Sequence, residues 1–254
     1  MSLVHAEYLK ITRRKLYPGM LLILGVLIGV VAFFLMVFAQ VVPEAAQEVP
    51  VLAKPGAYLI GAQQVASQTW FPLILGVVIL GGEMGSTVWA TSLTRESRKG
   101  RHILARLLVF TLASWLAFLI GAGIWSGVAA VAAEGSGSPG FGEWVGVIWR
   151  MGLVALAWTS LGLGAISMLR SLGPAIGAAL AFSFGESILA LWGPYENVSL
   201  SAATSGLFGA TMEGFVGAFL PGAGMSVAQS IGIIVGWTLF GLLLTWWGVQ
   251  RRDA

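Results

Sequence analysis

The sequence GEMGSTVWATSLTRESRKGRHILAR, residues 82–106, joins two long apolar runs through a short connection rich in arginine and lysine. Basic connections between membrane spans are typical of the cytoplasmic side. The same side would hold most of the other basic residues: Lys10, Arg13, Arg14, Lys15, Arg170, Arg251 and Arg252. Only Lys54 and Arg150 fall elsewhere, so the charge distribution predicts the orientation of the whole chain.

The composition indicates a polytopic membrane protein. Hydrophobic residues make up 57% of the 254 residues and charged residues only 10%, whereas about a quarter of the residues of a soluble domain are charged. At roughly 20 apolar residues per crossing, the chain has room for about six spans. We therefore expect an all-α bundle that forms a single transmembrane domain over residues 1–254.

Six apolar runs are long enough to cross a membrane. They cover residues 18–42, 70–90, 103–133, 144–169, 174–192 and 227–249. An even number of spans places both termini on one side, which the basic residues mark as cytoplasmic. The expected location is the inner or plasma membrane of a bacterium, with multiple passes.

Two segments outside these spans have patterns of their own. In residues 1–16, apolar and charged residues alternate, as in a short amphipathic helix that lies along the membrane interface; a simple topology anchor is the alternative. Residues 193–226 are too many for a structureless loop, and their apolar run 207–220 is too short to cross. We expect a re-entrant external hairpin there, and a more polar connection over 42–68 on the outer surface.

Three ionisable residues fall at membrane depth within the predicted spans: Glu83, Arg150 and Glu186. Arg106, near the start of the third run, counts with the basic residues of the cytoplasmic side. Such residues are costly in hydrocarbon and are functional candidates by default. Counted along their helices, Arg150 and Glu186 lie at similar depth, and we predict that they pair directly or through water. The pair would either fix the register of two helices or line a polar path. Glu83 would stabilise the turn after the second span, through Thr87, the N-terminal helix or Arg106.

The sequence lacks the residues that several kinds of chemistry require. No G-x-x-x-x-G-K-[ST] phosphate loop is present, so an ATPase would have to be a separate subunit. There is no cysteine, and the two histidines, His5 and His102, lie in separate basic segments. We therefore expect no enzymatic activity, catalytic residue, bound cofactor or metal site in this chain.

The connection after the second span resembles that of the permease subunits of type-2 ABC exporters. The resemblance lies in an acidic residue at the span end, a Gly-Thr-x-Trp-like turn, a Leu-Thr-Arg sequence and a Ser-Arg cluster. In this chain these features are Glu83, Gly85, Thr87, Trp89, Leu93, Thr94, Arg95, Ser97, Arg98 and Arg101. Ser86 is an extra residue between Gly85 and Thr87. The match covers about 25 residues in sequence, and the rest of the chain in layout only.

The resemblance implies a permease that works as a homodimer or with a related permease, bound to two copies of a cytosolic ATP-binding subunit. ATP and magnesium would bind to that partner. The segment 91–103 would be the coupling element, with Thr91, Leu93, Thr94, Arg95, Ser97, Arg98 and Arg101 in contact with the ATPase. The substrate path would lie between two protomers in the lipid membrane, and nothing indicates nucleic-acid binding. A non-transporting scaffold and a secondary transporter are the alternatives.

Overall fold

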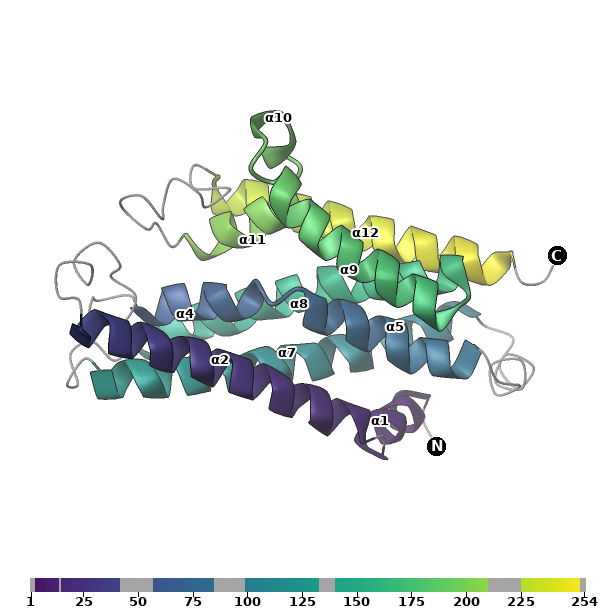
Figure 1. Ribbon diagram of the computed structural model, residues 1–254. Helices are drawn as coiled ribbons and strands as arrows, with labels where there is room; N and C mark the ends of the chain where they lie inside the picture. Colours follow the sequence, from purple (N-terminus) through teal and green to yellow (C-terminus); the bar gives the residue numbers. More distant parts are fainter. Residues whose placement is uncertain are drawn as a thin grey trace.

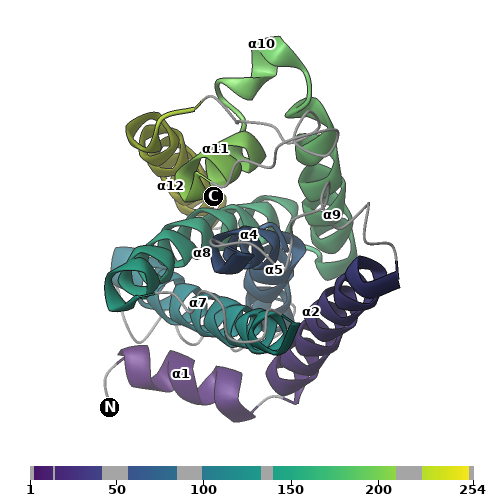
Figure 2. The same ribbon diagram turned by 90° about the vertical axis from the view of Figure 1, so that its left-hand side faces the viewer.

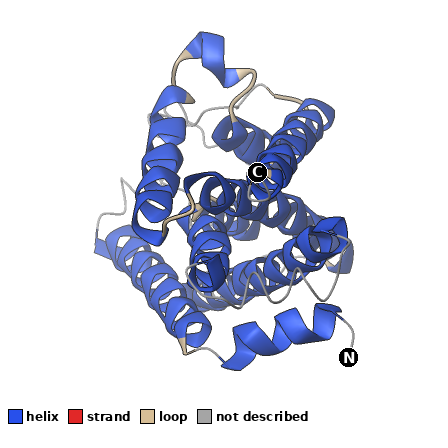
Figure 3. Ribbon diagram, turned by 90° about the vertical axis from the view of Figure 1, so that its right-hand side faces the viewer, coloured by secondary structure: helices blue, strands red, loops and turns tan. Residues whose placement is uncertain are grey.

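The computed structural model describes residues 3–13, 15–41, 57–84, 99–132, 140–209 and 225–251, and these are almost entirely helical (Figure 3). No strand occurs within these ranges. Six helical segments are long and apolar enough to cross a membrane, as expected of a multi-pass membrane protein. They are Leu16–Phe34, Gly61–Gly82, Gly100–Val128, Phe141–Leu169, Leu172–Leu189 and Val227–Gln250.

The long helices lie side by side and define two ends of the bundle (Figure 1). One end, here called the α1 end, carries α1 (Leu3–Arg13) and the start of α2 (Leu16–Val41). It also carries the start of α7 (Lys99–Ala132) and the last residues of the chain. The opposite end carries α10 (Gly193–Glu196) and α11 (Leu200–Phe208), and is called the α11 end.

The core is built around α8 (Phe141–Leu169). This helix packs against α7, against α5 (Trp70–Met84), against α9 (Leu172–Leu189) and most extensively against α12 (Val227–Gln250). Viewed along the bundle, α8 lies between α7 and α12 (Figure 2). Met151, Val154 and Trp158 on α8 are fully buried, whereas α2, α9 and α12 leave large apolar side chains exposed, as helices that face lipid do.

Small residues bring α8 and α12 close together. A Cβ atom added to Gly241 would lie 2.5 Å from Oγ of Ser160, and one added to Gly248 would lie 2.5 Å from the carbonyl oxygen of Ser167. On the other side of α8, a Cβ atom on Gly162 would lie 2.4 Å from the carbonyl oxygen of Leu73 in α5. Because lipid provides no hydrophobic force between helices, such close backbone packing is a main source of helix association in membranes.

The second span differs from its prediction. A helix, α4 (Ala57–Ala66), precedes α5, and the two are separated by a break at residues 67–69. The prediction that 42–68 covers the outer surface is therefore wrong for residues 57–66, because Ala62, Val65 and Ala66 are buried against the rest of the bundle. The polar residues Gln63, Gln64, Ser67 and Gln68 concealed this apolar helix in the sequence.

Some predicted boundaries also change. The described part of the segment 91–103, residues 99–103, forms the first turns of the long helix α7. In the region 193–226 the helix α11 begins at Leu200, before the predicted apolar run, and residues 210–224 of the predicted hairpin lie outside the described residues. The expected helix within residues 1–16 corresponds to α1, which runs across the axis of the bundle (Figure 2).

Candidate functional site

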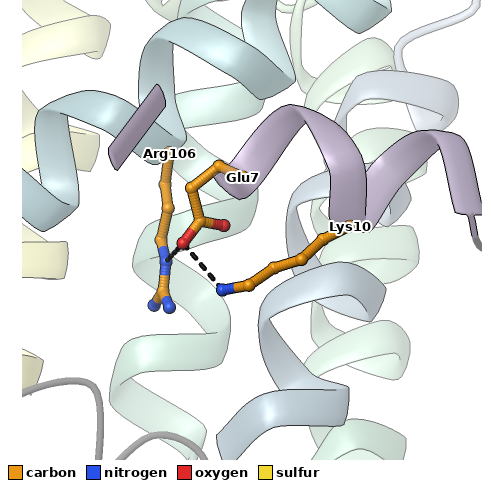
Figure 4. Close-up of polar contacts among 3 residues, drawn as sticks. All are labelled: Glu7, Lys10 and Arg106. Atoms are coloured by element: carbon orange, nitrogen blue, oxygen red, sulfur yellow. Dashed lines mark hydrogen bonds and ion pairs between the residues drawn. The ribbon is translucent and has the colours of Figure 1, made fainter. Parts of the chain in front are cut away.

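A cluster of three charged residues joins α1 to α7 at the α1 end (Figure 4). Oε1 of Glu7 lies 3.3 Å from Nε of Arg106 and 2.8 Å from Nζ of Lys10. Glu7 and Lys10 are one turn apart on α1, while Arg106 lies two turns into α7. The carboxylate therefore accepts hydrogen bonds from one cation on its own helix and one on the neighbouring helix.

Burial makes the pair between Glu7 and Arg106 more than a surface contact. The two side chains are only 3% and 2% exposed. Ile11, one turn after Glu7 on the same face of α1, is also buried. Separating the two charges would leave each of them in a poorly solvated place, which is strongly unfavourable. α1 is thus fixed to α7 by both charge and apolar packing.

A further contact ties α2 to the same helix. The hydroxyl of Tyr17, at the start of α2, donates a hydrogen bond to the carbonyl oxygen of Ala113 on α7 at 2.9 Å. Since α1 leads directly into α2 through residues 14 and 15, the first two helices of the chain are both anchored on α7. A displacement of α7 at this end would therefore be transmitted to α1 and α2.

The predicted coupling residues lie next to this cluster in the chain but mostly outside the described part. Thr91, Leu93, Thr94, Arg95, Ser97 and Arg98 are in the segment 85–98, which the structure does not describe. Arg101 is exposed in the first turn of α7. Of the predicted turn, Glu83 belongs to the last turn of α5, while Gly85, Thr87 and Trp89 lie outside the described residues.

A second polar cluster surrounds Glu186 near the end of α9, where only 2% of the residue is exposed. Oε1 accepts hydrogen bonds from the Ser199 hydroxyl at 2.7 Å and from the backbone N–H groups of Leu200 at 2.6 Å and Ser201 at 3.0 Å. Oε2 accepts from the N–H of Ser201 at 3.1 Å and from its hydroxyl. The first N–H groups of a helix lack partners within the helix, so this carboxylate satisfies the start of α11.

The predicted ion pair between Arg150 and Glu186 is wrong as a direct contact, because the oxygens of Glu186 are bound to the start of α11. The guanidinium of Arg150 instead lies 5.4 Å from the ring centroid of Trp149. It is also close enough to Tyr58 on α4 to act on that phenol's charge. Similar depth along two helices did not place the two side chains together, since depth does not determine the direction in which each helix points its side chains.

The break between α4 and α5 is also tied to α9. The hydroxyl of Thr69, in the break, lies 2.5 Å from the hydroxyl of Ser183, and both residues are buried. The freed backbone groups of the break find local partners: the carbonyl oxygen of Gln64 accepts from the Ser67 hydroxyl at 2.8 Å. The break is therefore a satisfied and anchored feature of the second span, as irregular backbone inside a membrane protein must be.

Sequence reasoning did not identify Glu7 or Ser199, and it gave Arg106 a different partner, Glu83. Glu7 is an acidic residue on the buried face of an otherwise basic amphipathic segment, and Arg106 falls inside the third predicted span. Each residue was visible as an exception to its surroundings, but their pairing was not. Ser199 was visible only as a possible helix cap, because a serine commonly precedes the first turn of a helix.

Comparison with models of known protein families found no match, and no curated protein matched the sequence.

Proposed function

We propose that the chain is the membrane permease subunit of an ATP-driven exporter of the type-2 ABC class. The observation that carries the proposal is the buried contact between Glu7 and Arg106. This contact joins α1 to α7 at Arg106, two turns after α7 begins. The connection 85–98, which leads into α7, belongs to the stretch that resembles the coupling region of that class. The six apolar helices supply the membrane domain that such a subunit needs.

In the proposed orientation the α1 end is cytoplasmic and the α11 end is external. The basic residues described at the α1 end support this orientation under the positive-inside rule. They are Lys10, Arg13, Lys15, Lys99, Arg101, Arg106, Arg170 and Arg251. α1 then lies along the inner interface, and α11 belongs to a re-entrant external region before the last span.

The coupling follows from how the helices at this end are joined. The connection 85–98 links the end of α5 to the start of α7. A partner subunit that pushes on this connection would move both helices, and α7 would carry α1 and α2 with it through Arg106 and Ala113. Packed helices transmit such displacements as rigid bodies. Closure of an ATPase dimer would in this way rearrange the helices that line the path.

The proposed assembly contains two permease chains and two ATP-binding subunits. ATP and magnesium bind to the ATPase, and the permease contributes the coupling residues Thr91, Leu93, Thr94, Arg95, Ser97, Arg98 and Arg101. The substrate path lies at the interface of the two permeases. The second permease is a copy of this chain or a related one, and the complex resides in the inner or plasma membrane.

The test is an affinity purification of the tagged chain from its native membrane in mild detergent, with partners identified by mass spectrometry. Recovery of an ATP-binding subunit with the unaltered chain and its loss with Arg95→Glu, Arg98→Glu and Arg101→Glu is the expected result. A matched control carries Arg170→Glu, Arg251→Glu and Arg252→Glu, which make the same change in charge at other positions of the predicted cytoplasmic side. The control chain should retain the ATPase. Absence of any ATPase with the unaltered chain would refute the proposal.

One observation favours a second candidate, a secondary transporter. Such proteins place substrate sites at helices broken within the membrane, and the second span is broken at residues 67–69. The usual arrangement has a corresponding break in an inverted repeat, whereas α9 and α12 are continuous over their described lengths. Transport driven by an ion gradient in liposomes that contain the chain alone would favour this candidate over the exporter.

A further inference from the structure

The helix α11 is inserted into the α11 end of the bundle. Seven of its nine residues are buried, and it packs against α4, α8, α9 and α12 (Figure 2). It contacts both α9, which comes before it in the chain, and α12, which comes after it. A short helix in this position closes the bundle between helices that belong to four different spans.

Polar contacts hold the segment before α11 on two sides. On one side, Glu186 of α9 binds Ser199, Leu200 and Ser201. On the other side, Nε1 of Trp237 in α12 donates a hydrogen bond to the carbonyl oxygen of Val198 at 2.8 Å. The contact with Trp237 is a single neutral hydrogen bond, whereas Glu186 provides a charged acceptor for several donors, and hydrogen bonds to ionised groups are about twice as strong as neutral ones.

Only one side of the contact between α9 and α11 is charged, and this favours the observed position of α11 within the bundle. α11 contributes only neutral donors, and neither α11 nor α12 contains an ionisable residue. If α11 withdrew, the carboxylate of Glu186 would remain among apolar helices without the donors that now satisfy it. An ionised side chain in such surroundings is strongly unfavourable. Retention of α11 therefore depends on the charge of one residue of another helix.

We propose that Glu186 is a latch that keeps α11 closed over the α11 end of the bundle, and that removal of its charge lets α11 withdraw. The latch consists of the Glu186 carboxylate and its donors on Ser199, Leu200 and Ser201. It concerns the opening of one end of this chain and does not require an ATPase partner, so its failure would leave the proposed function untouched.

The test uses the absence of cysteine from the natural sequence. A single Leu207→Cys change places a thiol at a fully buried position of α11. Its rate of labelling by a membrane-impermeant maleimide reports exposure of α11 in the full-length chain in proteoliposomes. In the Glu186→Gln background we expect the rate to rise about tenfold or more, since loss of the ionised acceptor removes the contact that opposes withdrawal.

Two controls separate release of α11 from general unfolding. Ala155→Cys places the probe at a fully buried position of α8, and its labelling rate should not change with Glu186→Gln. Glu143→Gln makes the same chemical change at the same end of the bundle, where Glu143 accepts a hydrogen bond from the N–H of Gly140 on its own segment. It should leave the labelling of Leu207→Cys as slow as in the parent.

A milder variant keeps the inference testable if Glu186→Gln does not fold. Ser201→Ala retains the charge and removes one hydroxyl donor, so it should increase the labelling of Leu207→Cys by a smaller factor than Glu186→Gln. Together the two changes should have no more effect than Glu186→Gln alone. The latch is refuted if Leu207→Cys stays protected in both variants, or if Ala155→Cys becomes reactive to the same extent.

Discussion

Oε1 of Glu7 lies 3.3 Å from Nε of Arg106, although 99 positions separate the two residues in the chain. Both side chains are buried, and the contact fixes a short crossing helix on the longest helix of the bundle. Lys10 contacts the same oxygen atom but is 29% exposed. A single carboxylate therefore makes one buried ion pair, with Arg106, and one partly solvated ion pair, with Lys10. We expect the loss of Arg106 and the loss of Lys10 to have different effects on stability.

Replacement of Arg106 by alanine should destabilise the folded chain by about 3–5 kcal/mol, because it leaves the buried Glu7 carboxylate beside an empty space, with the partly exposed Lys10 as its remaining counterion. Replacement of Lys10 by alanine should cost at most about 1 kcal/mol, as for other solvent-accessible pairs. Thermal unfolding in detergent, followed by fluorescence-detected size exclusion, would measure both. Equal losses of stability would contradict the burial of the Arg106 pair.

The double variant Glu7→Gln with Arg106→Met is the matched control. Removing both charges avoids an unpaired buried ion, and replacement of a whole buried pair by uncharged residues is often close to neutral. We therefore expect the double variant to be more stable than Arg106→Ala. If it is less stable than Arg106→Ala, the charge of the pair contributes net stability here.

Gly162→Ala should destabilise the bundle, because its Cβ atom would lie 2.4 Å from the carbonyl oxygen of Leu73. The backbone of α5 would have to move away, and overpacking of this kind costs about 1–3 kcal/mol. Gly236→Ala is the control, since a Cβ atom there meets nothing within 4 Å. It should be neutral or stabilising, because alanine favours the helix over glycine. The same unfolding assay distinguishes the two.

The apolar runs of the sequence were sufficient to predict the number of membrane helices and most of their positions. They failed for residues 57–66, because two adjacent glutamines interrupt the apolar pattern there, although the helix is largely buried and even Gln63 is only 5% exposed. Glycines that are four residues apart within the apolar helices do not mark the places where helices pack most closely. Gly173, Gly177, Gly232 and Gly236 leave open space, while the closest contacts occur at Gly61, Gly162, Gly241 and Gly248.

The polar clusters show why sites were harder to predict than helices. Arg150 and Glu186 were identified as charges at membrane depth, but their partners depend on three-dimensional arrangement. The carboxylate of Glu186 is satisfied by hydroxyl and backbone N–H groups at the start of α11. Backbone donors have no signature in the sequence, whereas a complementary charge does. A search of the sequence for the partner of a buried carboxylate therefore finds oppositely charged residues. It does not find the N–H groups at the start of a helix, which can satisfy the carboxylate equally well.

The hydrogen bond between Thr69 and Ser183 should stabilise the break in the second span. Thr69→Val keeps the shape and removes the hydroxyl, and we expect it to lower stability by about 1 kcal/mol, a typical value for one such bond. With Ser183→Ala in addition, the further loss should be small, because the partner is already gone. A double-mutant cycle from unfolding data gives the coupling energy of the pair directly.

A control for that cycle lies elsewhere in the core. The hydroxyls of Ser114 and Thr159 are also buried, but they are 3.4 Å apart, compared with 2.5 Å for Thr69 and Ser183. Hydrogen bonds between hydroxyls weaken well before the longer of these distances. The Ser114→Ala and Thr159→Val cycle should therefore give a coupling energy near zero. A coupling as large as that of Thr69 and Ser183 would show that the cycle does not report the hydrogen bond.

Titration of Tyr58 provides a test of the α11 end that is independent of unfolding. Burial and the negative charge of Glu143 raise the pKa of this phenol from 10.0 to about 12, while the positive charge of Arg150 opposes the increase. Because the neutral phenol is favoured in the folded state, its contribution to stability is complete below pH 10 and is lost as the pH rises toward 12. The difference in tyrosinate absorbance between the parent and Tyr58→Phe would give the midpoint directly.

Two charge changes should move that midpoint in opposite directions. Glu143→Gln removes a charge that raises the pKa of Tyr58, so the midpoint should fall toward 10.0. Arg150→Gln removes a charge that lowers the pKa, so the midpoint should rise further. Had Arg150 been paired with Glu186, its charge would be largely compensated there and its removal would leave Tyr58 unchanged. A shift with Arg150→Gln would agree with a guanidinium close to α4, and the absence of a shift would contradict that position.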